Sequence, residues 1–206
     1  VIIESLRAAQ IKKTYCTTDK SSAVKLARVY LSGLAHVVWH PDETIRARRE
    51  VIHSYGRAVK DTTRGRNRIR SWLTEHGLRS RSKGLRLTRL EGLSWVLERR
   101  DWTETQQLLI RQMFTDLWQA EARRKQLKSL MAKEITSDPA LLRLVRLFGV
   151  RHVTAYALAA VIGDIHRFRT PKQLVAYIGL MPKVASSGQK TRRGKLARCG
   201  RKELRR

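Results

Sequence analysis

Two stretches of the chain repeat apolar residues at intervals of three and four, and each is long enough for a helix of many turns. An α-helix turns once every 3.6 residues, so such a repeat places the apolar side chains on one face. The first seam consists of Ile45, Ile52, Tyr55, Val59, Ile69 and Leu73, and the second of Ile110, Met113, Leu117, Ala120, Leu127 and Met131. The seams predict two long helices that pack as an antiparallel hairpin, or that form an oligomerising, coiled-coil-like arm.

The predicted ends of these helices carry recognisable signals. Asp42 is a plausible N-cap for the first helix, which we expect to end near Gly77. Thr103 and Gln106 have the spacing of a capping box at the start of the second helix. Residues 79–89 between the helices carry five basic side chains and no acidic one, which predicts a basic loop.

The chain is strongly basic, with 44 Lys and Arg against 17 Asp and Glu and a formal net charge of +27. Such self-repulsion favours a polyanionic partner, and nucleic acid fits best because each phosphate contact releases counterions. No apolar run approaches the roughly 20 residues that span a bilayer, so we expect no membrane partner. The two cysteines, Cys16 and Cys199, form no zinc or disulfide pattern, which fits a reducing cytoplasm.

Near the C-terminus, two apolar segments flank a short turn. We predict short helices over Leu141–Phe148 and Thr154–Ile162, joined through Gly149 and Arg151. In helix-hairpin-helix modules such a turn presents backbone N–H groups to a DNA phosphate, and Arg151 adds a cation there. The alternative is an ordinary hairpin that buries Leu144, Leu147 and Leu158, and the net charge favours the DNA-binding interpretation.

Thr170 and Pro171 then predict the start of another helix, with Tyr177 on its apolar face. Ser186-Ser187-Gly188 follows this helix. A serine hydroxyl can attack a phosphodiester when nearby cations stabilise the developing charge. Cations follow at Lys190, Arg192, Arg193 and Lys195. On spacing alone the serine signal is weak, and a turn is favoured because Ser and Gly are ordinary turn residues. The alternative for the basic stretch beyond it is a disordered tail.

Asp19 is one of two carboxylates, with Glu4, within residues 1–40. A lone Asp is usually a helix cap, here for a helix that starts near Lys20. Val1–Ile3 has the pattern of the end of a buried strand. Magnesium-dependent phosphoryl chemistry needs several carboxylates that converge on the ion.

These segments together resemble the insertion-sequence transposases of the "one-ten" type, which are relatives of the Piv DNA invertases. The most specific residues are Phe148-Gly149-Val150, Ala155, Ile162-Gly163-Asp164, Phe168, Pro171, Gln173–Leu180, Pro182 and Ser186-Ser187-Gly188. Thr18-Asp19, Ala23, Leu26, Ala27 and Arg28 resemble the family's "KTDxxDAxxLA" segment, which is the last part of a RuvC-like DEDD domain.

The resemblance implies that Ser187 is the nucleophile toward DNA, and that Asp19 is the third of four acidic residues that bind Mg²⁺. It also implies a guide RNA in at least some members. Ser22 stands where the family has its fourth acidic residue, and the first two acidic positions would precede Val1. We therefore expect an N-terminally truncated member with an incomplete metal site, which leaves open whether this chain is an active enzyme.

The predicted fold class is mainly α. We expect a remnant of an α/β RuvC-like domain over residues 1–35, a helical coiled-coil arm over 36–137, and a C-terminal helix-hairpin-helix domain over 138–206. The predicted function is DNA strand cleavage and joining by an insertion-sequence transposase. The predicted DNA-binding residues are Gly149, Arg151, Lys190, Arg192, Arg193 and Lys195.

The alternative is a non-catalytic, basic nucleic-acid-binding protein in which Ser187 is a turn residue. The expected partners are DNA, a guide RNA and further copies of the chain. The expected location is the nucleoid in the cytoplasm of a bacterium.

Overall fold

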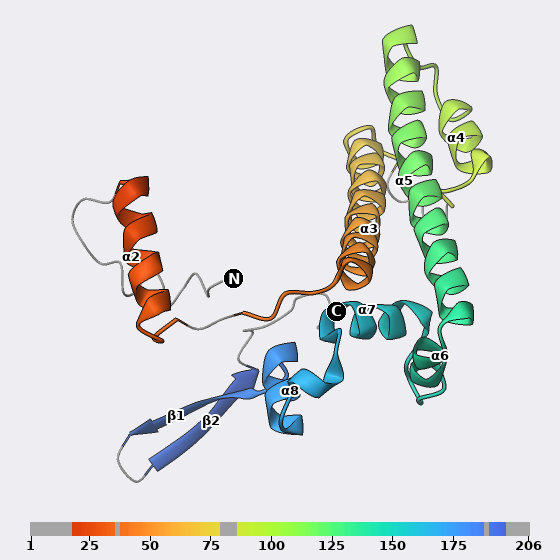
Figure 1. Cartoon of the computed structure of the whole chain (residues 1–206). Helices are drawn as coiled ribbons and strands as arrows, with labels where there is room; N and C mark the ends of the chain where they lie inside the picture. Colours follow the sequence, from red (N-terminus) through yellow and green to blue (C-terminus); the bar gives the residue numbers. More distant parts are fainter. Residues whose placement is uncertain (1–17, 36–37, 79–85, 188–189, 197–206) are drawn as a thin grey trace. The chain divides into compact units, whose positions relative to one another are not determined.

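The computed structural model describes residues 18–35, 38–78, 86–187 and 190–196 (Figure 1). The chain divides into two compact units, Val1–Asp42 and Glu43–Arg206, which are treated separately below. The described part is mainly helical, which confirms the predicted fold class at that level. No described helix combines the length and the apolar character that a membrane crossing requires. The predicted strand at Val1–Ile3 lies outside the described residues.

The first unit contains helix α2, Asp19–Leu31, whose N-cap is Thr18. The Thr18 hydroxyl accepts from the Ser21 backbone N–H at 3.2 Å, and the Thr18 N–H donates to the Ser21 hydroxyl at 3.0 Å. The prediction that Asp19 caps this helix is therefore wrong. Thr18 takes that place because Ser21 can complete a reciprocal capping box with it, and Asp19 becomes the first helical residue, where its charge favours the helix dipole.

The second unit is organised by two long helices, α3 (Glu43–Glu75) and α5 (Glu104–Ser137), which run antiparallel (Figure 1). The ion pairs between them fall in reverse order along the two helices: Arg48–Glu134, Arg66–Glu121 and Arg68–Asp116. Helix α3 begins directly after Asp42, the residue predicted to cap it. The predicted capping box of Thr103 with Gln106 at the start of α5 is confirmed.

The predicted seams supply the core between α3 and α5. The buried seam residues are Ile52, Ile69, Leu73, Ile110, Leu117, Ala120 and Met131. Thr62 interrupts the first seam but is itself buried, and its hydroxyl donates to the Ala58 carbonyl at 2.9 Å. This local bond satisfies the hydroxyl, so the polar break does not disrupt the seam.

Helix α4 (Leu90–Leu97) was not predicted from the sequence. It contributes Leu93 and Val96 to a core cluster at the end of the long helices, together with Trp102. The Trp102 indole N–H donates to the Val96 carbonyl at 2.8 Å, which ties the end of α4 to the start of α5. Of the predicted basic loop, residues 79–85 lie outside the described part of the chain.

The rest of the second unit consists of short elements. Helices α6 (Pro139–Val145), α7 (His152–Ile162) and α8 (Pro171–Ile178) are followed by an antiparallel hairpin of β1 (Pro182–Ser187) and β2 (Lys190–Leu196). A 3₁₀ turn, η1 (Ile165–Arg167), separates α7 from α8. Helix α7 packs on α3, α5 and α6.

The hairpin corrects the prediction of a turn at Ser186-Ser187 and of a disordered tail beyond it. Both serines belong to β1, and Lys190 to Leu196 form its partner strand. Backbone hydrogen bonds make this ladder, so the positive charge that suggested disorder does not prevent pairing. Gly188, Gln189 and residues 197–206 lie outside the described part.

Two glycines inside helices, Gly92 of α4 and Gly56 of α3, test how closely α4 packs against the segment that precedes it. A Cβ added at Gly92 would lie 2.8 Å from the Arg86 carbonyl oxygen, whereas one added at Gly56 would meet nothing within 4 Å. We expect Gly92→Ala to lower the free energy of unfolding by about 1–3 kcal/mol because the backbone of residue 86 must move. Gly56→Ala should raise it by about 0.5–1 kcal/mol through helix propensity. Urea unfolding of both variants measures the two values, and equal stabilisation by both would contradict the close approach at Gly92.

Candidate nucleic-acid interface

The turn between α6 and α7 has the backbone geometry that its glycine predicts. The Val150 N–H donates to the Leu147 carbonyl at 3.1 Å, and Gly149 between them has a φ of +80°. A side chain at that φ would be strained, so glycine is the residue that allows the chain to reverse here. The predicted pair of helices is confirmed, although α6 ends at Val145 and α7 begins at His152.

The N-terminus of α7 opens onto this turn without a side-chain cap. Its N-cap residue, Arg151, makes no capping hydrogen bond, whereas threonine or aspartate side chains cap α2, α5, α6 and α8. Arg151 and His152 are both exposed. The first N–H groups of a helix and the positive end of its dipole suit a phosphate, and an arginine beside them adds a full charge.

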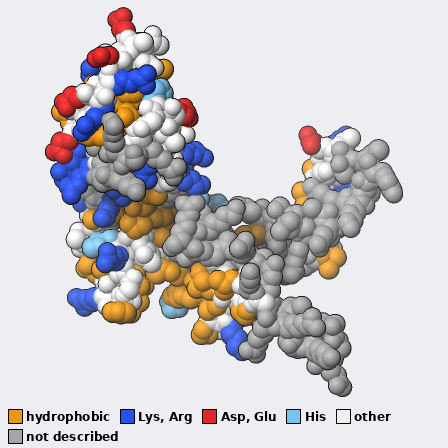
Figure 2. All heavy atoms as spheres, turned by 180° about the vertical axis from the view of Figure 1, so that it is seen from behind, with side chains coloured by type: hydrophobic (Ala, Val, Ile, Leu, Met, Phe, Trp, Pro, Cys, Tyr) orange, Lys and Arg blue, Asp and Glu red, His pale blue; other side chains and the backbone are white. Residues whose placement is uncertain are grey.

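The surface around the turn is basic and apolar. Residues 139–163 contain no Asp or Glu, while Arg143, Arg146 and Arg151 are exposed. The alternative in which Leu147 is buried does not hold, since Leu147 is 56% exposed; Leu141 is the buried leucine of this hairpin. Figure 2 shows hydrophobic side chains on the surface below the long helices, and Lys and Arg side chains over those helices.

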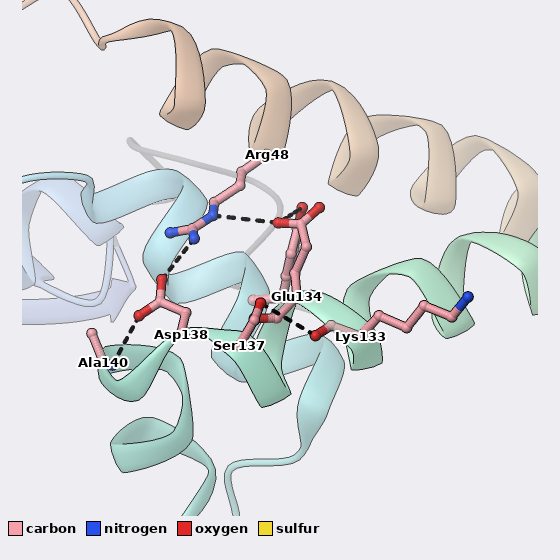
Figure 3. Close-up of polar contacts among 7 residues, drawn as sticks. Arg48, Lys133, Glu134, Ser137, Asp138 and Ala140 are labelled. Carbon is pink, nitrogen blue, oxygen red and sulfur yellow. Dashed lines mark hydrogen bonds and ion pairs between the residues drawn. The ribbon is translucent and has the colours of Figure 1, made fainter.

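A polar network holds α6 and α7 against the long helices (Figure 3). The Tyr156 hydroxyl donates to a Glu134 carboxylate oxygen at 3.0 Å, and the Tyr156 residue is fully buried. The Arg48 guanidinium lies between two carboxylates, at 2.6 Å from Asp138 and 3.5 Å from Glu134. Asp138 also accepts from the Ala140 N–H at 2.9 Å and so caps α6.

This network shifts the pKa of two of its members. Burial raises the pKa of the Tyr156 hydroxyl, and the neighbouring Glu134 carboxylate raises it further. Burial alone would raise the pKa of Asp138, but the hydrogen bonds from Arg48 and from the Ala140 N–H outweigh it and hold that pKa below its ordinary value. Both groups therefore keep, at neutral pH, the protonation state that the network requires.

Arg49 connects the other end of α7 to α8. Its guanidinium donates to the carbonyls of Ala160 at 2.8 Å and Val161 at 3.1 Å, and to the Tyr177 hydroxyl at 3.5 Å. The last carbonyls of a helix lack partners inside the helix, so these bonds cap α7. Neither Arg49 nor the Arg48 network was predicted, because no local pattern links α3 to α7 across more than a hundred residues.

Helix α8 begins as its sequence predicts. The Thr170 hydroxyl accepts from the Gln173 N–H at 3.4 Å, and Pro171 occupies the first turn. Tyr177 is half-buried, with its ring 5.3 Å from that of Phe168 and the Arg167 guanidinium 4.3 Å away. These contacts favour the predicted packing role of Tyr177 over that of a nucleophile.

The β1–β2 hairpin brings the predicted serine and the predicted cations onto one element. Ser187 pairs with Lys190, and Arg192 and Arg193 pair with residues 185 and 184 of β1. Lys195 lies further along β2.

Asp19 belongs to the other unit, where it is exposed and is the one acidic residue of α2. Within the described ranges, no group of three His, Cys, Asp or Glu side chains could hold a metal ion. The described surroundings of Asp19 therefore do not amount to the several-carboxylate site that Mg²⁺ takes.

The family model and the relatives that the chain matches are all described as transposases. Residues 142–206 match the family described as "Transposase IS116/IS110/IS902 family". The chain is 27% identical to a putative transposase, y4qE, of Sinorhizobium fredii over 188 residues, which cover 91% of the chain and 45% of the relative.

Two further relatives are named as transposases. One is a probable family 20 transposase of Pseudomonas aeruginosa, 30% identical over 77% of the chain and 48% of the relative. The other is the transposase for insertion sequence element IS1111A of Coxiella burnetii, 29% identical over 65% of the chain and 37% of the relative. The chain thus spans less than half the length of each of these relatives.

The Arg48–Asp138 pair predicts how stability depends on pH. Because the folded-state pKa of Asp138 lies below its ordinary value, its contribution is present at neutral pH and is lost as the pH falls through the folded pKa. We expect Asp138→Asn to lower the free energy of unfolding by about 1–3 kcal/mol at pH 7. The difference from the parent should shrink below about pH 4.

Asp61→Asn is the matched control, since Asp61 lies 3.7 Å from Arg64 in an exposed pair of the same helix. That substitution should change the free energy of unfolding by less than about 1 kcal/mol at either pH. Urea unfolding across the pH range measures both variants. A loss in Asp138→Asn that stays constant down to pH 3 would contradict the ionic contribution of Asp138.

Proposed function

Because the chain belongs to the IS116/IS110/IS902 transposase family, we propose that it is a DNA-binding part of an insertion-sequence transposase that cleaves and joins DNA strands. The observation that carries this proposal is the family match over residues 142–206, which includes the serine and the cations of the β1–β2 hairpin. The uncapped start of α7, the absence of acidic residues from 139–163 and the net charge of +27 support DNA as the partner.

In the proposed reaction, the Ser187 hydroxyl oxygen attacks a DNA phosphorus. The serine O–H proton is lost, a P–O bond to one side of the strand breaks, and the departing DNA oxygen takes up a proton. The strand is then held as a phosphodiester on the serine, and attack by a hydroxyl of a second strand joins the strands and frees Ser187. Lys190, Arg192, Arg193 and Lys195 are the proposed phosphate contacts, which stabilise the charge that develops on the phosphate oxygens.

The family's Mg²⁺ would supply a Lewis acid that polarises the phosphate. Asp19 is the residue of this chain proposed as one of its ligands. The described residues around Asp19 do not fit a complete site, and no step of the proposed reaction runs through the ion.

The finer architecture is part of the same proposal. We assign α6 and α7 to a helix-hairpin-helix module, α3 and α5 to a coiled-coil arm that joins copies of the chain, and α2 to the end of a RuvC-like domain. The division at residues 35 and 137 follows these assignments. We further propose that a structured guide RNA is a partner of the protein. The proposed location is the nucleoid of a bacterial cell.

Substitution of the serine tests the chemistry. In the full-length gene product with Mg²⁺ and element DNA, Ser187→Ala should reduce strand cleavage to below about one thousandth of the parent, because the attacking oxygen is gone. Ser186→Ala is the matched control, since residue 186 pairs with Thr191 one step along the same strand, and it should retain cleavage. Cleavage that survives Ser187→Ala, measured on labelled DNA in a sequencing gel, would exclude Ser187 as the nucleophile.

A second function, nucleic-acid binding without catalysis, is favoured by one observation: within the described residues, Asp19 has no acidic neighbour on its helix. Under this proposal the hairpin and the turn hold DNA, and Ser187 has no chemical role. Both proposals require phosphate contacts, and the serine substitution above separates them.

Salt dependence tests the phosphate contact at the α6–α7 turn. The logarithm of the DNA-binding constant should fall steeply with the logarithm of salt concentration, and Arg151→Ala should reduce the slope by about one. Arg111→Ala, an exposed arginine on α5 remote in sequence from the turn, is the control and should leave the slope unchanged. Fluorescence anisotropy of a labelled duplex gives the slopes, and DNA binding that is insensitive to salt would contradict phosphate contact.

A further inference from the structure

The most exposed large apolar side chain of the described residues is Phe148, whose relative exposure is 107%. It occupies the first corner of the turn that the Leu147 carbonyl and the Val150 N–H close, and Gly149 occupies the second corner. The positive φ of Gly149 fixes the direction of the chain at this point, so Phe148 is held at the apex of a defined turn. Leu147 beside it is 56% exposed.

The charged residues near Phe148 in the sequence are all basic. Exposed Arg143 and Arg146 precede it, exposed Arg151 follows it, and no acidic residue occurs in 139–163. An exposed leucine of α5 differs in this respect, because Leu108 lies one helical turn after Glu104. An apolar side chain framed by arginines suits a partner that has both phosphates and stacked bases, and duplex DNA has both.

We propose that Phe148 is a wedge that inserts between neighbouring base pairs of duplex DNA. This inference rests on the proposed DNA-binding function and adds that the turn distorts the duplex that it binds. The flanking arginines and the start of α7 hold the phosphates on either side of the opened base-pair step. These contacts offset the free energy that unstacking costs. Pyrimidine–purine steps yield most easily and are therefore the preferred point of insertion.

The experiment uses a duplex in which 2-aminopurine replaces adenine at TA steps, because the fluorescence of this base rises when it is unstacked. The full chain should increase the fluorescence on binding. Phe148→Ala should remove most of this increase and weaken binding by about tenfold, the size expected for the loss of one aromatic–base contact. Phe148→Trp should retain both.

Leu108→Ala is the matched control, since it removes another exposed apolar side chain, 66% exposed, from a different helix of the same unit. It should leave fluorescence and affinity unchanged. Thermal unfolding should be the same for the parent, Phe148→Ala and Leu108→Ala, because neither side chain is buried.

Four outcomes would overturn the wedge. They are an equal fluorescence increase in Phe148→Ala, no increase with the parent bound, an increase with unpaired RNA but not with duplex DNA, and an effect of Phe148→Ala on self-association alone. Loss of all salt-dependent DNA binding would instead contradict the proposed function. The two failures are therefore distinguishable in one set of titrations.

Discussion

The second unit depends on the burial of α7. This helix has no Lys, Arg, Asp or Glu between His152 and Ile162, and five of its residues are buried. Such a helix cannot face water on all sides, and α3, α5 and α6 cover it. Tyr156 is the one buried residue of α7 with a polar side-chain group, and its hydroxyl donates to Glu134 of α5, so the burial leaves that group hydrogen-bonded.

Two adjacent arginines of α3 make this packing specific. Arg48 pairs with Asp138 and Glu134 near the start of α6, while Arg49 caps the last carbonyls of α7. The same Arg49 reaches Tyr177, which lies just ahead of the strand that carries Ser187. The long helices therefore set the position of the α6–α7 turn, and they are tied through α8 to the segment that leads into the β1–β2 hairpin.

The sequence predicts what local periodicity and capping determine. The seams, the Thr103 and Thr170 caps and the Gly149 turn are set by residues within a few positions of one another, and each is present in the structure. The cap of α2 was misassigned because Thr18 and Asp19 are both good caps and only the partner, Ser21, decides between them.

The features that the sequence did not predict depend on distant contacts. Helix α4 is stabilised by burying Leu93 and Val96 in a cluster drawn from α3 and α5. The β1–β2 hairpin is rich in polar and basic residues and has no clear alternation, so its pairing register could not be read from the pattern. For the candidate site, the motif match assigned Ser187 a role, and the register then placed Lys190 directly opposite it. The proposed role of Asp19 as a Mg²⁺ ligand rests on the family resemblance alone.

The central claim is that the Ser187 oxygen forms a bond to DNA during strand transfer. The most direct measurement is mass spectrometry of the full-length protein quenched in denaturant during reaction with element DNA, followed by protease and nuclease digestion. The account predicts a nucleotide joined through phosphate to the peptide at Ser187. Cleaved DNA accompanied by an adduct at another residue, or by no adduct at any quench time, would contradict it.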